Sequence, residues 1–173
     1  MMLDKSSLVS GILEIFTVPY EPATMTEFAK KLTKVYTDYA KKGMSYAGNP
    51  IVSESKTAME SVLYVLDSPA NSVAIFASTV EQSVIAYWGT VTFAVFPFPP
   101  GFGLVNLVTH TNPKQSSIQP GFIATTLAPS NAQIKAQSYA DILHSATLGV
   151  MTSHFGLDIT LLVPKSELDK PIM

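Results

Sequence analysis

The sequence predicts a mainly α fold: a helical bundle of about five helices, with a long ordered loop rich in proline and glycine and one or two short strands. Hydrophobic residues make up 47% of the chain and charged residues 14%, a balance that provides a large core and excludes disorder. Apolar residues recur at helical spacing along most segments, and most of these segments have recognisable helix starts or stops. With 173 residues, the chain is expected to form a single domain, residues 1–173.

Caps mark the first two helices. Asp4 is a suitable N-cap for the first helix, which Pro19 and Pro22 end. Thr24 and Glu27 have the spacing of a capping box at the start of the second helix. The expected buried stripes of the two helices consist of Leu8, Ile12, Ile15, Phe16, Met25, Phe28, Leu32, Val35, Tyr36 and Tyr39.

The third and fourth helices are expected at residues 55–66 and 72–95, with Asn71 as the N-cap of the fourth. The fourth is apolar on most sides, which is typical of a buried helix. Residues 90–92 near its end are β-branched and would suit a buried strand equally well. Both interpretations stay open for that end of the segment.

Residues 96–130 are expected to form an extended loop or arm. Prolines and glycines between residues 96 and 103 predict a stiff, turning connector, and a short strand is expected at residues 104–108. Residues 109–130 contain three prolines and few periodic apolar residues, so we expect a long ordered loop there. Loops of this length are uncommon in compact domains and are often functional. The segment is therefore a candidate contact surface.

The last helix is expected to start at Ser130 or Asn131 and to run to about Phe155, with Gly156 as its stop. Residues 158–163 alternate weakly and are expected to form a terminal strand. The residues that follow, 165–173, are polar enough to predict a tail.

Composition argues against several classes of function. The chain has no cysteine, which excludes disulfides and Cys-based zinc sites. It has no arginine and a net charge of −2. In the second expected helix, Glu27 and Asp38 are interleaved with the lysines, a pattern that indicates an ordinary solvated face. We therefore expect no nucleic acid as a partner. His110, His144 and His154 lack the spacing of a metal-binding motif. No metal and no cofactor are expected.

A membrane-associated protein is one alternative, because residues 82–113 carry no formal charge if the histidine is neutral. However, only residues 83–96, about 14 of them, could form an unbroken helix, whereas a span needs about 20. No lysine cluster flanks the segment. At the N-terminus, Asp4 and Lys5 precede the apolar stretch, so no export signal is predicted. We therefore do not expect contact with a membrane.

A small hydrolase or ligand-binding protein is the other alternative. Asp141 and His144 are three residues apart and could share a helix face, as in a carboxylate that orients a base. With His110, they could line a pocket near His144 and beside Trp88. The glycines at residues 43–48 are too far apart for a nucleophile elbow. A surface hydrogen bond or ion pair is the simpler interpretation of the Asp141–His144 pair, and a non-enzymatic protein is expected.

Four segments resemble small structural proteins of tailed-bacteriophage virions: residues 2–8, 26–32, 36–40 and 136–142. Those proteins have a short first helix, then an amphipathic helix that ends in a tyrosine-containing segment. The resemblance implies a non-enzymatic virion subunit of a tail, neck, baseplate or capsid, present in symmetric copies. Its implied partners are other copies of itself and other virion proteins, through interfaces more apolar than ordinary surface.

The contact surfaces are expected on residues 96–102 and 110–129. Low charge and clustered aromatic residues are the features that indicate them. The residues expected at this interface are Phe96, Phe98, Phe102, His110, Ile118 and Phe122.

Overall fold

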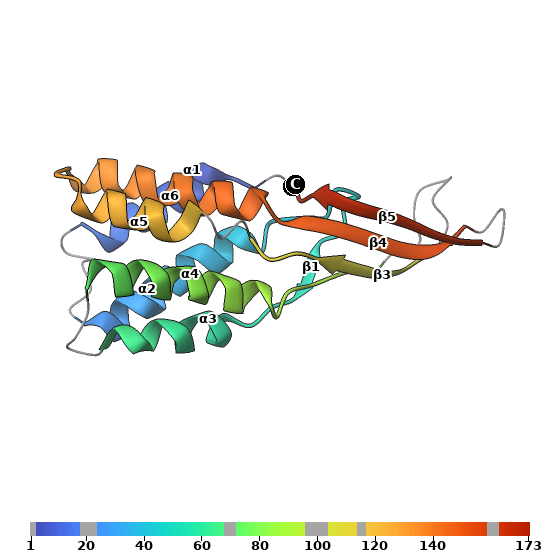
Figure 1. Ribbon diagram of the computed structural model, residues 1–173, viewed down its shortest axis with the longest axis horizontal. Coiled ribbons are helices and arrows are strands. Elements are labelled where there is room, and N and C mark those ends of the chain that lie inside the picture. Colours follow the sequence, from blue (N-terminus) through green and yellow to red (C-terminus); the bar gives the residue numbers. More distant parts are fainter. Residues whose placement is uncertain (1–2, 18–23, 68–71, 96–103, 114–116, 159–162) are drawn as a thin grey trace.

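The computed structural model describes residues 3–17, 24–67, 72–95, 104–113, 117–158 and 163–173. These residues form six α-helices, one 3₁₀ turn and five strands. The helices make a bundle, and a three-stranded sheet extends from one end of it, so the molecule is elongated (Figure 1). The predicted mainly α fold with short strands is confirmed at this level. The proline- and glycine-rich residues 96–103 lie outside the described residues.

The first two helices begin where their caps predict. The side chain of Asp4 accepts a hydrogen bond from the amide of Ser6 at the start of α1 (Lys5–Ile15). Thr24 accepts from the amide of Glu27 at 3.1 Å at the start of α2 (Met25–Ala40). These contacts satisfy amides that a helix cannot pair internally.

The middle of the bundle combines three helical segments and a small sheet. Ser55 caps α3 (Lys56–Leu63), which continues as the 3₁₀ turn Tyr64–Asp67. Ser72, one residue after the expected Asn71, caps α4 (Val73–Trp88). The residues after α4 form β2 (Thr92–Phe93), which pairs antiparallel with β1 (Ile51–Ser53). The helix therefore ends at Trp88 rather than near residue 95, and of the β-branched residues 90–92 only Thr92 lies in a strand.

The prediction of a long loop at residues 109–130 is wrong for ten of these residues, which form the helix α5 (Ile118–Leu127). Pro120 lies in the first turn of α5, where a missing N–H removes no helical hydrogen bond. A Cβ at Gly121 would lie 2.9 Å from the side chain of Ile142, so the glycine allows α5 to approach α6 (Ala132–Leu148). Residues that suggested a loop therefore serve a helix and its packing.

The C-terminal segment also differs from the prediction. α6 begins after its N-cap Asn131, as expected, but ends at Leu148 rather than near Phe155. The next residues form β4 (Met151–Asp158), and the expected polar tail forms most of β5 (Val163–Pro171). Polar residues are common on an edge strand, because one side of such a strand faces water.

Buried aromatic side chains connect three helices in the core. Trp88 of α4 donates its indole N–H to the hydroxyl of Tyr36 of α2 at 2.9 Å. That hydroxyl lies 2.9 Å from the Thr147 hydroxyl of α6, which itself donates to the carbonyl of Leu143. Burial raises the pKa of Tyr36 to about 12. The phenol therefore stays protonated and holds its polar neighbours inside an apolar core.

Candidate interaction surface on the three-stranded sheet

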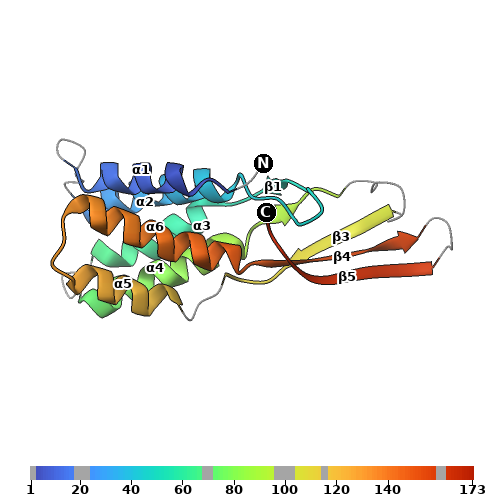
Figure 2. The ribbon, with the colours of Figure 1, turned by 90° about the horizontal axis from the view of Figure 1, so that it is seen from above.

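The sheet that extends from the bundle consists of β3 (Leu104–His110), β4 and β5, with β4 in the centre. All neighbouring strands are antiparallel, and each pairing contains one register irregularity. The strands run away from the helices in both views (Figures 1 and 2). The end of β5 returns to the junction with the bundle, where Met173 and Met44 exchange two backbone hydrogen bonds of 2.8 and 2.9 Å. The base of the sheet is therefore fixed to the body.

One face of the sheet is attached to the body by buried polar contacts. His154 of β4 places Nε2 3.1 Å from the hydroxyl of Ser45 and 3.3 Å from the side-chain oxygen of Asn49. The ring of Tyr46 packs edge-on against the same imidazole. Burial lowers the pKa of His154, because a charged imidazole would lose its hydration there.

His110, the last residue of β3, also contacts the body from this face of the sheet. One ring nitrogen of His110 lies 2.9 Å from the carbonyl oxygen of Val91, and the ring packs against Trp88 and Phe93. Val108, two residues earlier on β3, is buried, and His110 is half-buried. We call this side of the sheet the inner face.

The opposite side of the sheet, the outer face, presents apolar side chains to solvent. Leu107 of β3 is 52% exposed and lies opposite Phe155 of β4, which is 37% exposed. Leu168 of β5 is 55% exposed. Leu107 and Phe155 are direct neighbours in the β3–β4 ladder, and exposed apolar neighbours on one sheet are typical of a contact surface. We call these three side chains the outer-face patch.

The two edges of the sheet differ in composition. β5 carries Lys165, Glu167, Asp169 and Lys170 between two prolines, Pro164 and Pro171. Charged residues and prolines are the usual protection of an edge strand against pairing with another chain. β3 contains neither a charged residue nor a proline. Within the described part of the chain, β3 and β5 each pair with β4 alone.

The structure places the residues expected at the interface in three different environments. Phe96, Phe98 and Phe102 lie outside the described residues. His110 lies on the inner face of the sheet. Ile118 and Phe122 are buried in the bundle, so the expectation that they lie on an exposed contact surface is wrong. They face inward because the segment that carries them is a helix of the core and not a loop.

Sequence reasoning missed the outer-face patch. Leu107 was expected on a short strand, but Phe155 was assigned to a helix and Leu168 to a tail. The alternation of the apolar residues Met151, Phe155 and Leu157 with the polar residues Thr152, His154 and Asp158 is the sequence signal of a half-buried strand. It extends over few residues and directly follows a long helical pattern, which explains why it was not recognised.

The residues proposed for hydrolysis are engaged in separate contacts. Lys5 of α1 donates to Asp141 at 2.8 Å, and Gln137 donates to the same carboxylate oxygen at 3.0 Å. Nδ1 of His144 forms a hydrogen bond with the hydroxyl of Tyr39. Burial, and secondarily Lys5, lowers the pKa of His144, while Asp141 acts in the opposite direction. His110 binds a carbonyl at the sheet, so these hydrogen bonds do not join it to Asp141 or His144.

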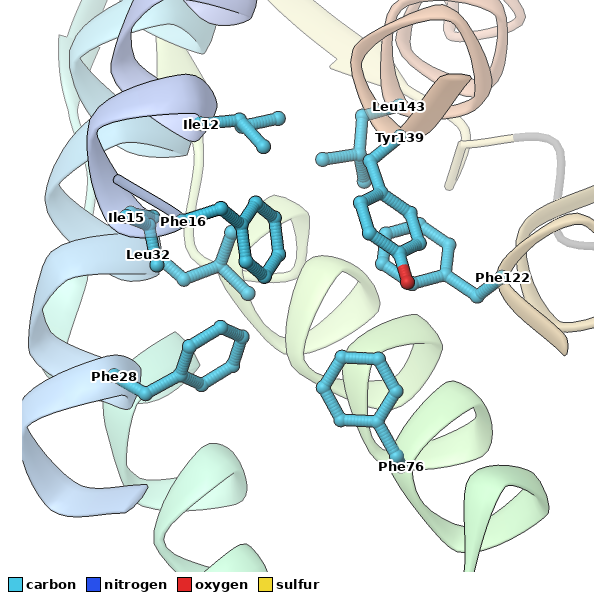
Figure 3. Close-up of a pocket in the computed structure, with 9 residues that line it drawn as sticks. All are labelled: Ile12, Ile15, Phe16, Phe28, Leu32, Phe76, Phe122, Tyr139 and Leu143. Atoms are coloured by element: carbon cyan, nitrogen blue, oxygen red, sulfur yellow. The ribbon is translucent and has the colours of Figure 1, made fainter. Parts of the chain in front are cut away.

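A small hollow lies inside the bundle among apolar side chains of α1, α2, α4, α5 and α6 (Figure 3). Phe28, Phe76 and Phe122 point into it, as does the ring of Tyr139. The cavity volume is about 10 Å³, the space of a single water molecule. An organic substrate would not fit there. Neither this hollow nor the shallow groove between α1 and α2 at Gly11 and Val35 is lined by His144.

Among the described residues, no three His, Asp or Glu side chains are grouped so that they could hold a metal ion. No helix in that part of the chain is long and apolar enough to cross a membrane.

No protein-family model, curated protein or solved structure matches this chain.

Proposed function

We propose that the chain is a non-enzymatic structural subunit of a tailed-bacteriophage virion, where it makes protein–protein contacts in a tail, neck, baseplate or capsid. The observation that carries this proposal is the outer-face patch of Leu107, Phe155 and Leu168 on a sheet that extends from the bundle. An apolar surface on an extended element is suited to burial between subunits. The resemblance of the N-terminal helices to virion proteins supports the assignment to a particle.

The rest of the molecule is suited to a supporting role. The bundle contains a closed aromatic core, and its hollow has room for about one water molecule. Inner-face contacts of His154 and His110 fix the sheet to this body. A rigid body with a fixed apolar surface can be placed in many identical copies, which is the property that a symmetric particle requires.

The first experiment measures the native mass of the untagged chain by light scattering over a range of concentrations. A structural subunit is expected to form species larger than the 18.6 kDa monomer. Replacing the outer-face patch together, by Leu107→Ser, Phe155→Ser and Leu168→Ser, is expected to reduce the mass. The matched control replaces Leu127 and Ile134, exposed apolar residues of the bundle, with serine and should leave the mass unchanged.

A second measurement tests the assignment to a particle. Mass spectrometry of purified particles of the phage that encodes the chain should detect it at a fixed number of copies per particle. Absence from purified particles would reject the virion assignment, whatever the mass in solution. Loss of assembly in the bundle control, with an unaffected outer-face variant, would instead reject the sheet as the contact surface.

A further inference from the structure

We propose that β3 pairs antiparallel with β3 of a second copy of this chain, so that two three-stranded sheets join into one six-stranded sheet. This inference rests on the proposed function as an assembly subunit, and it identifies a second copy of the chain as the partner of the sheet. An edge strand presents unpaired backbone N–H and C=O groups, which another strand can satisfy. Two edges are available in the described sheet, those of β3 and β5, so the first question is which edge pairs.

The edge of β5 is unsuited to pairing. Pro164 and Pro171 lack the N–H that a ladder needs. Pairing β5 with itself at full overlap would place Glu167 opposite Glu167 of the other copy, and like charges directly opposite each other destabilise a sheet. Both edge strands carry a register irregularity, so this feature does not distinguish them. The two edge strands differ instead in their charged residues and prolines.

The edge of β3 has the opposite character. Its seven residues include no charge and no proline, and the chain carries no charged residue other than Lys114 between Glu81 and Lys135. Self-pairing of β3 therefore opposes no like charges. The inner face of β3 already packs against Trp88 and Phe93 through His110. The outer edge and the outer face are the sides of this strand that a second copy can use.

The pairing also joins the two apolar surfaces. The antiparallel register that overlaps all seven residues of β3 places Leu107 opposite Leu107 of the second copy. Directly opposed residues in an antiparallel pair point to the same side of the sheet, so the outer faces of both copies lie on one side. Leu107 and Phe155 of each copy then form one continuous apolar band. A two-fold axis at Leu107 closes the pair, as in most homodimers.

A cross-linking experiment on the full chain tests the register. The chain contains no cysteine, so Leu107→Cys introduces a single thiol. Opposed residues of an antiparallel pair have Cα atoms about 4.5–5.5 Å apart, within the range of about 4.4–6.8 Å that a disulfide requires. Oxidised glutathione serves as the oxidant, and non-reducing gel electrophoresis measures the product. Leu107→Cys is expected to convert mainly to a covalent dimer.

Ser166→Cys is the matched control, because Ser166 is exposed and pairs with Phe155 of β4 but lies on the β5 edge, outside the outer-face patch. It is expected to remain mainly a single chain under the same oxidation. Equal cross-linking at both positions, or preferential cross-linking at residue 166, would overturn the proposal. The fluorescence of Trp88, the single tryptophan, shows whether each variant is folded.

A charge substitution gives a second, independent readout. Leu107→Lys places two lysines opposite each other in the proposed pair and should raise the dissociation constant by about tenfold or more. Ser166→Lys adds the same charge to the β5 edge, outside the outer-face patch, and should change the dissociation constant by less than about twofold. Equal effects of the two lysine substitutions would overturn the pairing, because they would assign the contact to the outer face of the sheet rather than to the β3 edge. A full chain that stays monomeric would overturn the pairing, while its detection in particles would leave the proposed function standing.

Discussion

The backbone amide of Gln119, in the first turn of α5, donates a hydrogen bond to the carboxylate of Glu81 in α4 at 3.1 Å. The N-cap residue of α5, Ser117, provides no side-chain cap of its own. A carboxylate from a neighbouring helix therefore performs the capping role and also complements the positive end of the helix dipole. The contact connects α5, the helix that was not predicted, to the centre of the bundle.

Replacing Glu81 tests this cap. Glu81→Ala is expected to reduce the free energy of unfolding by about 1 kcal/mol, because α5 loses both an acceptor and a favourable charge. Glu81→Gln keeps an acceptor and should have a smaller effect. Urea unfolding followed by Trp88 fluorescence measures the difference. Equal stability of the alanine variant and the original chain would contradict a capping role.

Two glycines are expected to be essential for helix packing. A Cβ at Gly11 would lie 2.6 Å from the side chain of Val35, so Gly11→Ala should separate α1 from α2. Gly121→Ala should act in the same way on α5 and Ile142 of α6. Overpacking of this kind costs about 1–3 kcal/mol in the free energy of unfolding, measured by chemical denaturation.

Gly89→Ala is the control for both glycine variants. A Cβ at Gly89 would make ordinary contacts, the nearest at 3.5 Å, and the φ angle of −60° suits alanine. The substitution should leave stability unchanged or raise it slightly, because alanine restricts the unfolded chain. A loss as large as that of Gly11→Ala would contradict the packing explanation.

The hydroxyl of Tyr36 is expected to contribute more to stability than an exposed hydroxyl. Tyr36→Phe removes the acceptor of the Trp88 indole and the partner of Thr147. A buried donor without an acceptor costs about 1–3 kcal/mol. In the control, Tyr64→Phe removes an exposed hydroxyl that binds Glu60 and should change stability by less than about 0.5 kcal/mol. Thermal unfolding of both variants gives the comparison.

The stability of the protein is expected to fall in mild acid because of His154. Burial lowers the pKa of His154 in the folded chain below the value of about 6.5 that an exposed histidine has when the chain unfolds. The stabilisation is therefore complete above about pH 6.5 and is lost as the pH falls from there through the folded-state pKa. His144, whose pKa is also lowered, contributes in the same direction.

Unfolding free energies between pH 7.5 and pH 5 measure this dependence. His154→Gln removes one titrating group, and the remaining slope should be smaller than that of the original chain. A stability that rises with acidification, or an NMR titration that places the pKa of His154 above that of an exposed histidine, would contradict the burial argument.

The helices that were predicted well have their signals close together in the sequence. Asp4, Thr24, Ser55 and Asn131 each cap a helix that begins one residue later. A cap and the turn that it serves are separated by three residues at most, so one sequence contains the whole interaction. Most of the bundle could therefore be predicted.

The sheet and α5 depend on partners far along the chain. β3 and β4 pair residues such as Leu107 and Phe155, which are separated by two helices. The capping group of α5 is Glu81, on a different helix. No local sequence pattern identifies either partner, so a loop was predicted where α5 forms and a tail where most of β5 forms. Ile118 and Phe122 were expected at an exposed surface for the same reason, because an apolar residue has the same place in the sequence pattern whether it faces solvent or the core.

The order of strands along the chain also determines when the outer-face patch comes into existence during synthesis. β3 leaves the ribosome before α5 and α6, whereas Phe155 and Leu168 follow both helices. Domains commonly fold as they are synthesised, so the bundle can close before the sheet acquires its centre and second edge. A newly made chain thus lacks a complete outer-face patch until its body has formed. In the proposed assembly, this timing disfavours contact through the patch between neighbouring nascent chains on one messenger RNA.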